Sequence, residues 1–124
     1  MRPRVAFVPG PYFQDSEFAC RDCGLFVPNI QLRTILEQAR EALGRPIIID
    51  SGTRCVVHNA QVGGRPNSAH LTGEAADVRC FADDTRWALL KIFFALGVKR
   101  IELAPTWLHI DVSRTLPQKV AFYQ

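Results

Sequence analysis

The spacing of apolar residues predicts a first helix over residues 29–43. Isoleucine, leucine and alanine recur there every three or four positions, which is typical of a helix with one apolar face. Asn29 is a suitable N-cap, and Gly44 provides the stop at the C-terminal end. A helix of this kind should cover one face of a sheet.

A second helix is predicted over residues 85–96. The acidic pair Asp83-Asp84 precedes it, where negative charge is stabilised by the helix dipole, and Gly97 follows its last turn. We expect its apolar face to contain Trp87, Leu90, Phe94 and their neighbours.

The remaining pattern predicts strands, with one short helix over residues 57–62. A β-branched run at residues 46–50 indicates a buried strand that ends in a turn at residues 51–54. Further strands are expected at residues 74–80, 100–103 and 107–112. Helices and strands in this order predict a single-domain α+β fold with a mostly antiparallel sheet.

The last two strands should form a hairpin whose turn is centred on Pro105-Thr106. In that register Leu103 faces Leu108, and Glu102 faces His109. The apolar residues then share one face and the polar residues the other, whereas a slip by one residue would mix the two sets. The remaining expected pairs are Ile101 with Ile110 and Arg100 with Asp111.

Composition supports a single domain and excludes several classes of protein. The chain has 124 residues, 22% of them charged, and a net charge of +3 that is scattered rather than clustered. Nucleic-acid binding is therefore not expected. Apolar stretches are too short to cross a bilayer, and residues 1–10 lack the apolar core of a signal peptide. We expect an irregular segment at residues 1–28, a core at about 29–113, synthesis in the cytoplasm and a monomer.

His70, Asp77 and His109 form a candidate metal site. His70 and Asp77 lie seven positions apart across Gly73, and His109 belongs to a predicted half-buried strand. Imidazole and carboxylate groups both bind zinc, and three protein ligands leave the fourth position open for water, as in catalytic sites. The expected cofactor is therefore Zn²⁺.

A zinc hydrolase also needs a proton acceptor and a cation. Glu102 and Asp111 are the candidate general bases, because both belong to the polar face of the predicted hairpin. Asp111 has an alternative role, which is to accept a hydrogen bond from a ligating imidazole. Arg54, in the loop after the buried strand, is the candidate cation for an anionic group of the substrate.

The four cysteines leave three interpretations open. Cys20-x-x-Cys23, together with Cys55 and Cys80, contains enough thiols for a structural zinc site, although the second pair lacks the close spacing of a zinc ribbon. Disulfides would form outside the cell, whereas thiols stay reduced in the cytoplasm. Cys55 and Cys80 also fit as small buried side chains beside the predicted site.

Several motifs resemble zinc peptidases of bacterial cell walls. Ser68-x-His70-x-x-Gly73-x-Ala75-x-Asp77 followed by His109-x-Asp111 is similar to the family of D-Ala-D-Ala carboxypeptidases and phage L-alanyl-D-glutamate endolysins, which share the hedgehog fold. The resemblance extends over about residues 13–113. Motifs similar to the small phage-encoded branch are Phe18-Ala19-Cys20, Ser51-Gly52-x-Arg54-Cys55 and His58-Asn59-x-x-Val62-Gly63-Gly64-x-Pro66-x-Ser68.

This resemblance implies that His70, Asp77 and His109 bind zinc and that Arg54 and Ser68 line the substrate site. It also implies hydrolysis of peptide bonds in peptidoglycan stem peptides, by a protein of phage or prophage origin that reaches the wall after release from the cell. The chain departs from several relatives at Thr106, three residues before the last ligand, where they have an acid or a histidine. The alternative is a zinc-binding module that binds the cell wall, or forms part of a phage particle, without catalysis.

Overall fold

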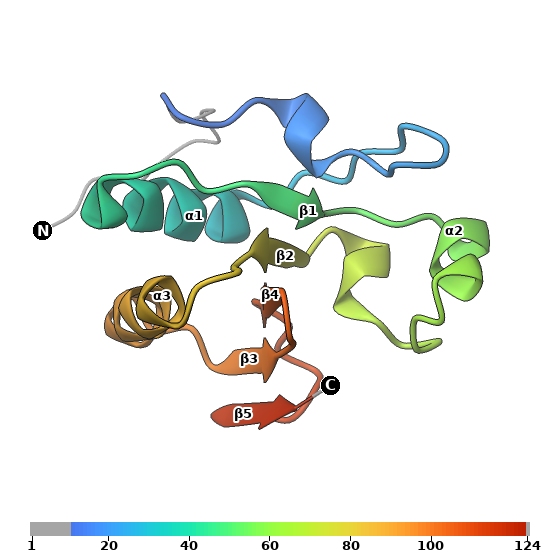
Figure 1. The fold of residues 1–124 in the computed structure, drawn as a ribbon. Coiled ribbons are helices and arrows are strands. Elements are labelled where there is room, and N and C mark those ends of the chain that lie inside the picture. Colours follow the sequence, from blue (N-terminus) through green and yellow to red (C-terminus); the bar gives the residue numbers. More distant parts are fainter. Residues whose placement is uncertain (1–10, 124) are drawn as a thin grey trace, which may run out of the picture.

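A five-stranded sheet forms the centre of the protein (Figure 1). The computed structural model describes residues 11–123. The strands are β1 (Ile49–Ser51), β2 (Ala75–Arg79), β3 (Arg100–Leu103), β4 (Trp107–Asp111) and β5 (Val120–Tyr123). Their order across the sheet is β1-β2-β4-β3-β5, and every neighbouring pair is antiparallel except β3 and β5. The predicted α+β fold with a mostly antiparallel sheet is confirmed.

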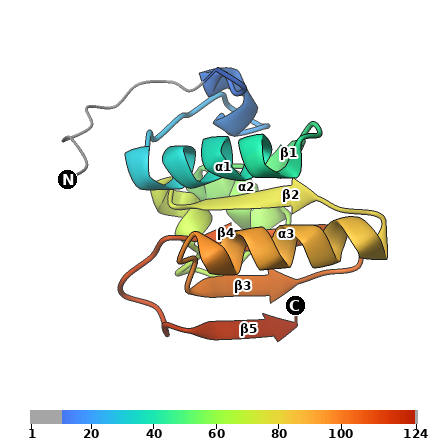
Figure 2. The ribbon, with the colours of Figure 1, turned by 90° about the vertical axis from the view of Figure 1, so that its left-hand side faces the viewer.

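Helices lie on both faces of this sheet. They are α1 (Ile30–Leu43), α2 (Val56–Gln61) and α3 (Asp83–Ala95), with short 3-10 helices η1 (Asp15–Phe18) and η2 (Ala69–Thr72). Figure 2 shows α1 and α3 side by side in front of the sheet, with α2 behind it. No helix among residues 11–123 is long and apolar enough to span a bilayer.

The helix predicted over residues 29–43 is confirmed at both ends. The side chain of Asn29 accepts a hydrogen bond from the Leu32 N–H at 2.8 Å, and Gly44 takes the left-handed conformation with φ 73°. The predicted irregular segment begins with residues 1–10, which lie outside the described residues. The expected lack of a signal peptide rests on these same residues. Residues 11–28 contain a single helical turn, η1.

The predicted apolar face of the second helix is wrong. The side chains of Trp87 and Phe94 are 68% and 57% exposed, whereas Leu89 and Phe93 are buried and Leu90 is half-buried. Residues 88–96 are apolar apart from Lys91, so the spacing of apolar residues in the last two turns of α3 does not indicate which face of the helix is buried. Packing against α1 and the sheet buries the pair spaced by four positions, Leu89 and Phe93.

The hairpin register is confirmed, and the first strand is shifted. Leu103 pairs with Leu108 and Glu102 with His109, as the alternation of apolar and polar residues predicted. β1 begins at Ile49 rather than residue 46, because its residue pairing with β2 begins with Ile49 opposite Val78. The sheet therefore has an apolar face beneath α1 and α3 and a polar face on the opposite side.

Gly73→Ala is expected to destabilise the fold more than Gly44→Ala. Both glycines end a helix with φ near 75°, which costs other residues about 1–2 kcal/mol. An added methyl group at Gly73 would also collide with the Val27 backbone, for a further loss of about 1–3 kcal/mol, whereas at Gly44 it meets nothing within 4 Å. Urea unfolding of the two variants measures the difference, and equal losses would contradict it.

Candidate metal centre

His70 is oriented by two hydrogen bonds, one from its backbone N–H and one from its ring. It lies in η2, where Ser68 Oγ accepts a hydrogen bond from the His70 N–H at 3.2 Å. The ring Nδ1 is 2.7 Å from the carbonyl oxygen of Gly52. A carbonyl only accepts, so Nδ1 carries the proton and Nε2 of the neutral ring is left with a free lone pair.

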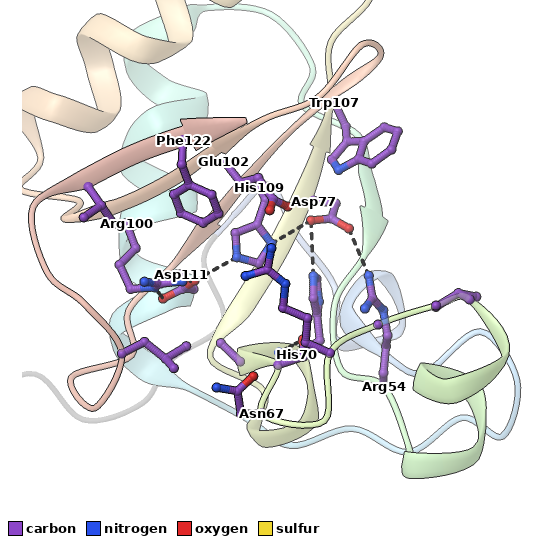
Figure 3. Close-up of a pocket in the computed structure, with 18 of the residues that line it drawn as sticks. Arg54, Asn67, His70, Asp77, Arg100, Glu102, Trp107, His109, Asp111 and Phe122 are labelled. Atoms are coloured by element: carbon purple, nitrogen blue, oxygen red, sulfur yellow. Dashed lines mark hydrogen bonds and ion pairs between the residues drawn. The ribbon is translucent and has the colours of Figure 1, made fainter. Parts of the chain in front are cut away.

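Asp77 and His109 reach the same point from neighbouring strands. Asp77 on β2 pairs with His109 on β4, and both side chains project from the polar face of the sheet (Figure 3). Asp77 Oδ1 lies 3.2 Å from His70 Nε2 and 3.0 Å from His109 Nδ1. The ligand atoms of all three residues lie within 4.8 Å of one another. The structure thus brings together the three predicted metal ligands.

The donor set fits a zinc ion. In the neutral form of His70, its Nε2 lone pair faces a carboxylate oxygen, which places two acceptors against each other. A cation between them removes this conflict. Two imidazoles and one carboxylate are a typical set for catalytic zinc.

Asp111 orients His109 from the other side of the ring. Its Oδ2 is 2.7 Å from His109 Nε2, and its Oδ1 accepts hydrogen bonds from Arg100 Nε at 2.8 Å and from the Ser113 N–H at 3.1 Å. The side chain of Asp111 is 0% exposed. Both carboxylate oxygens of Asp111 therefore already have hydrogen-bond partners. This arrangement fits the alternative role given to Asp111 above, which is to accept a hydrogen bond from a ligating imidazole.

Arg54 contacts the metal-ligand carboxylate directly. Its NH2 group lies 3.3 Å from Asp77 Oδ2, while Asn59 Oδ1 holds NH1 at 3.1 Å and Ser51 Oγ holds Nε at 3.3 Å. The sequence indicated a cation for the substrate at this position. It did not indicate that the same guanidinium fixes the second oxygen of Asp77.

The cluster shifts the pKa values of its members strongly. Burial alone would raise the pKa of Asp77, but the interactions of its carboxylate with His109 and His70 hold it well below its usual range. Burial would lower the pKa of His109, but Asp111 and Asp77 raise it to about 9. Without a metal, His109 is therefore a cation between two carboxylates.

The metal-free protein is expected to lose stability as the pH rises from about 6.5 to 9. A raised pKa of His109 contributes stability that is fully present below its unfolded value of about 6.5 and is lost above its folded value of about 9. Thermal unfolding with a chelator measures this trend, and His109→Gln is the control for other titrating groups. An identical pH dependence in the two proteins would contradict the assignment.

A pocket of about 660 Å³ opens over these residues. Arg54, Ser68 and Glu102 line it, as do several residues that the sequence did not indicate. Glu102 lies beside His109 on the neighbouring strand (Figure 3). Thr106 lies in the exposed β3–β4 turn and does not line the pocket. The lining residues that the sequence did not assign to the site are Val62, Gly63, Gly64, Arg65, Asn67, Ala69, Arg100, Trp107, Leu116, Pro117, Val120 and Phe122.

Comparison with protein families gives the same indication as this geometry. A family model described as peptidase M15 matches residues 11–111. The chain belongs to this family. M15 peptidases are zinc-dependent, so the chain is a metallopeptidase by family, and His70, Asp77 and His109 all lie within the matched region. A search of curated proteins found no match.

The cysteines lie in two separate places. Cys20, Cys23 and Cys55 form a second group of potential ligands within 4.8 Å of one another, and Cys80 is buried elsewhere, with its thiol 3.6 Å from the Ala82 carbonyl oxygen. The four-cysteine metal site that the sequence left open is therefore wrong, because β2 carries Cys80 away from the other three.

Proposed function

We propose that the protein hydrolyses peptide bonds in the stem peptides of bacterial peptidoglycan, with zinc bound by His70, Asp77 and His109. The observation that carries this proposal is the orientation of the two imidazoles. One nitrogen of each ring is held by an acceptor, Gly52 O or Asp111, and the other nitrogen faces Asp77 Oδ1. Such second partners are typical of metal-ligating histidines.

Glu102 is the better candidate for the general base. When bound, zinc polarises a peptide carbonyl and lowers the pKa of a water molecule. Glu102 lines the pocket and makes no hydrogen bond or ion pair within the described part of the chain, so its carboxylate is available to take a proton. Asp111 is buried and its oxygens are already engaged.

Arg54 and Ser68 are proposed to bind the substrate. A guanidinium has five N–H donors, and three atoms of Arg54 contact Ser51, Asn59 and Asp77 within the protein. The remaining N–H groups are available for a carboxylate of the stem peptide. The Ser68 hydroxyl lines the same pocket and provides a further donor.

The cell-wall substrate and a phage or prophage origin rest on the family and on the sequence motifs. Stem peptides are short, carry free carboxylates and contain small D-amino acids. A pocket that combines Arg54 and Arg65 with the aromatic rings of Trp107 and Phe122 suits such a peptide. In this proposal the protein acts on the wall after release from the cell.

The test is release of new amino groups from purified peptidoglycan by the zinc-loaded protein, with and without a chelator. Mass spectrometry of the products identifies the bond. Loss of terminal D-alanine indicates a carboxypeptidase, and a new N-terminal D-glutamate indicates an endopeptidase. Failure to cleave walls of several types at full zinc occupancy would contradict the proposal and favour a binding module without catalysis.

A further inference from the structure

A second group of metal-binding side chains lies outside the pocket. The sulfur atoms of Cys20, Cys23 and Cys55 lie within 4.8 Å of one another, and all three thiols are free. Cys20 and Cys23 belong to the loop after η1, and Cys55 directly precedes α2, so two distant segments meet here (Figure 1). A single disulfide would use two of these thiols and leave the third beside it.

The loop that carries Cys20 and Cys23 has a tight, well-defined turn. The Cys20 N–H donates to the Leu25 carbonyl at 2.7 Å, and the Gly24 N–H donates to the Cys20 carbonyl at 2.9 Å. Gly24 has φ 78°, which favours glycine. This turn directs both thiols of the Cys-x-x-Cys segment to one side, as a metal ion requires.

Backbone N–H groups donate to two of the three sulfurs. The Cys55 N–H lies 3.4 Å from Cys20 Sγ, and the His58 N–H lies 3.4 Å from Cys55 Sγ. Hydrogen bonds of this kind stabilise a thiolate relative to a thiol, and the thiolate is the form that binds metals. The sulfurs of Cys20 and Cys55 thus each have a partner that also helps to orient them.

His58 is the candidate for a fourth ligand. It lies three residues after Cys55, the N-cap of α2, and therefore on the first turn of this helix. Its ring nitrogens lie outside the group of sulfurs within 4.8 Å of one another, so ligation requires its side chain to turn toward them. It is half-buried, and its ring makes no hydrogen bond or ion pair with residues 11–123. The spacing becomes Cys-x-x-Cys followed by Cys-x-x-His, and three cysteines with one histidine are a common structural zinc set.

We propose that Cys20, Cys23, Cys55 and His58 bind a second, structural zinc ion. This ion would link the loop after η1 to the β1–α2 loop, where the Thr53 N–H already donates to the Phe18 carbonyl at 2.8 Å. Arg54 lies between Thr53 and Cys55 and contacts Asp77. The second ion therefore holds one wall of the pocket in place without contacting the substrate.

The test is the zinc content of protein purified under reducing conditions, measured by native mass spectrometry. The expected content is about two zinc ions per chain for the unmodified protein and about one for Cys23→Ser, whose side chain is exposed and whose replacement should not disturb the core. Cys80→Ser is the matched control and should keep both ions. His58→Ala should bind the second ion more weakly.

Cobalt substitution separates this site from the peptidase site. Asp77→Asn should retain the sulfur-to-cobalt charge-transfer absorption, and Cys23→Ser should lose it, whether or not the protein cleaves peptidoglycan. Equal zinc content in the unmodified protein and Cys23→Ser would overturn the proposal. So would a reduced protein with four reactive thiols and a single zinc, or a disulfide within the group and no second zinc after reduction.

Discussion

Asp77→Asn is expected to remove zinc from the site formed with His70 and His109, and with it hydrolysis. Asp77 Oδ1 lies between the two imidazoles, and its carboxylate is the only anionic member of the set. Loss of a partner that merely orients a ligand typically costs about 10–100-fold in metal affinity. Loss of the ligand charge itself should cost more than that. Competition with a chromogenic chelator measures the affinity.

Asp50→Asn is the matched control for this prediction. Asp50 lies on the neighbouring strand and also pairs with an arginine, at 2.8 Å from Arg79 NH2, but it does not line the pocket. Its replacement should leave zinc affinity and hydrolysis unchanged. If Asp77→Asn binds zinc as tightly as Asp50→Asn does, the proposed ligand set is wrong.

Glu102→Gln is expected to lower kcat by about 10²–10⁴-fold with zinc affinity unchanged, because positioned proton transfer contributes a factor of this size. Glutamine keeps the size of the side chain and removes its ability to accept a proton. Glu102 faces His109 across the hairpin without contacting the other two ligands in the described structure. Turnover of a peptidoglycan peptide at saturating zinc measures the effect.

Asp111→Asn should behave differently, because its carboxylate supports a ligand. Its replacement weakens the partner of His109 Nε2 and leaves Arg100 without its buried counterion. We expect zinc affinity to fall by about 10–100-fold and excess zinc to restore part of the turnover. If Asp111→Asn were inactive at full zinc occupancy and Glu102→Gln were active, Asp111 would be the base.

Features determined by local sequence were predictable. The ends of α1 follow from one capping side chain and one glycine, and the hairpin register follows from the alternation between Glu102 and Ile110. That register already placed Glu102 beside His109. Bringing His70 to the same point was an inference from residue type and family resemblance, since nothing in its own segment indicates the approach of the Gly52 carbonyl.

Features that depend on distant contacts were not predictable. Apolar residues lie on several sides of α3, so packing against α1 and the sheet determines that Phe93 is buried and Phe94 exposed. β5 was missed because it is short and its residues alternate only between half-buried and exposed. It forms through parallel pairing with β3, and a parallel pair has no tight connecting turn that the sequence could indicate.

The position of β5 has a consequence for the order of events during synthesis. All three proposed zinc ligands have been translated by residue 109, yet Val120 and Phe122, which complete the pocket wall, come later and dock beside β3. A small domain folds as one cooperative unit, so its last strand must be available before the sheet is complete. The pocket wall of the proposed peptidase would therefore be complete only after residue 122 has left the ribosome and β5 has paired with β3.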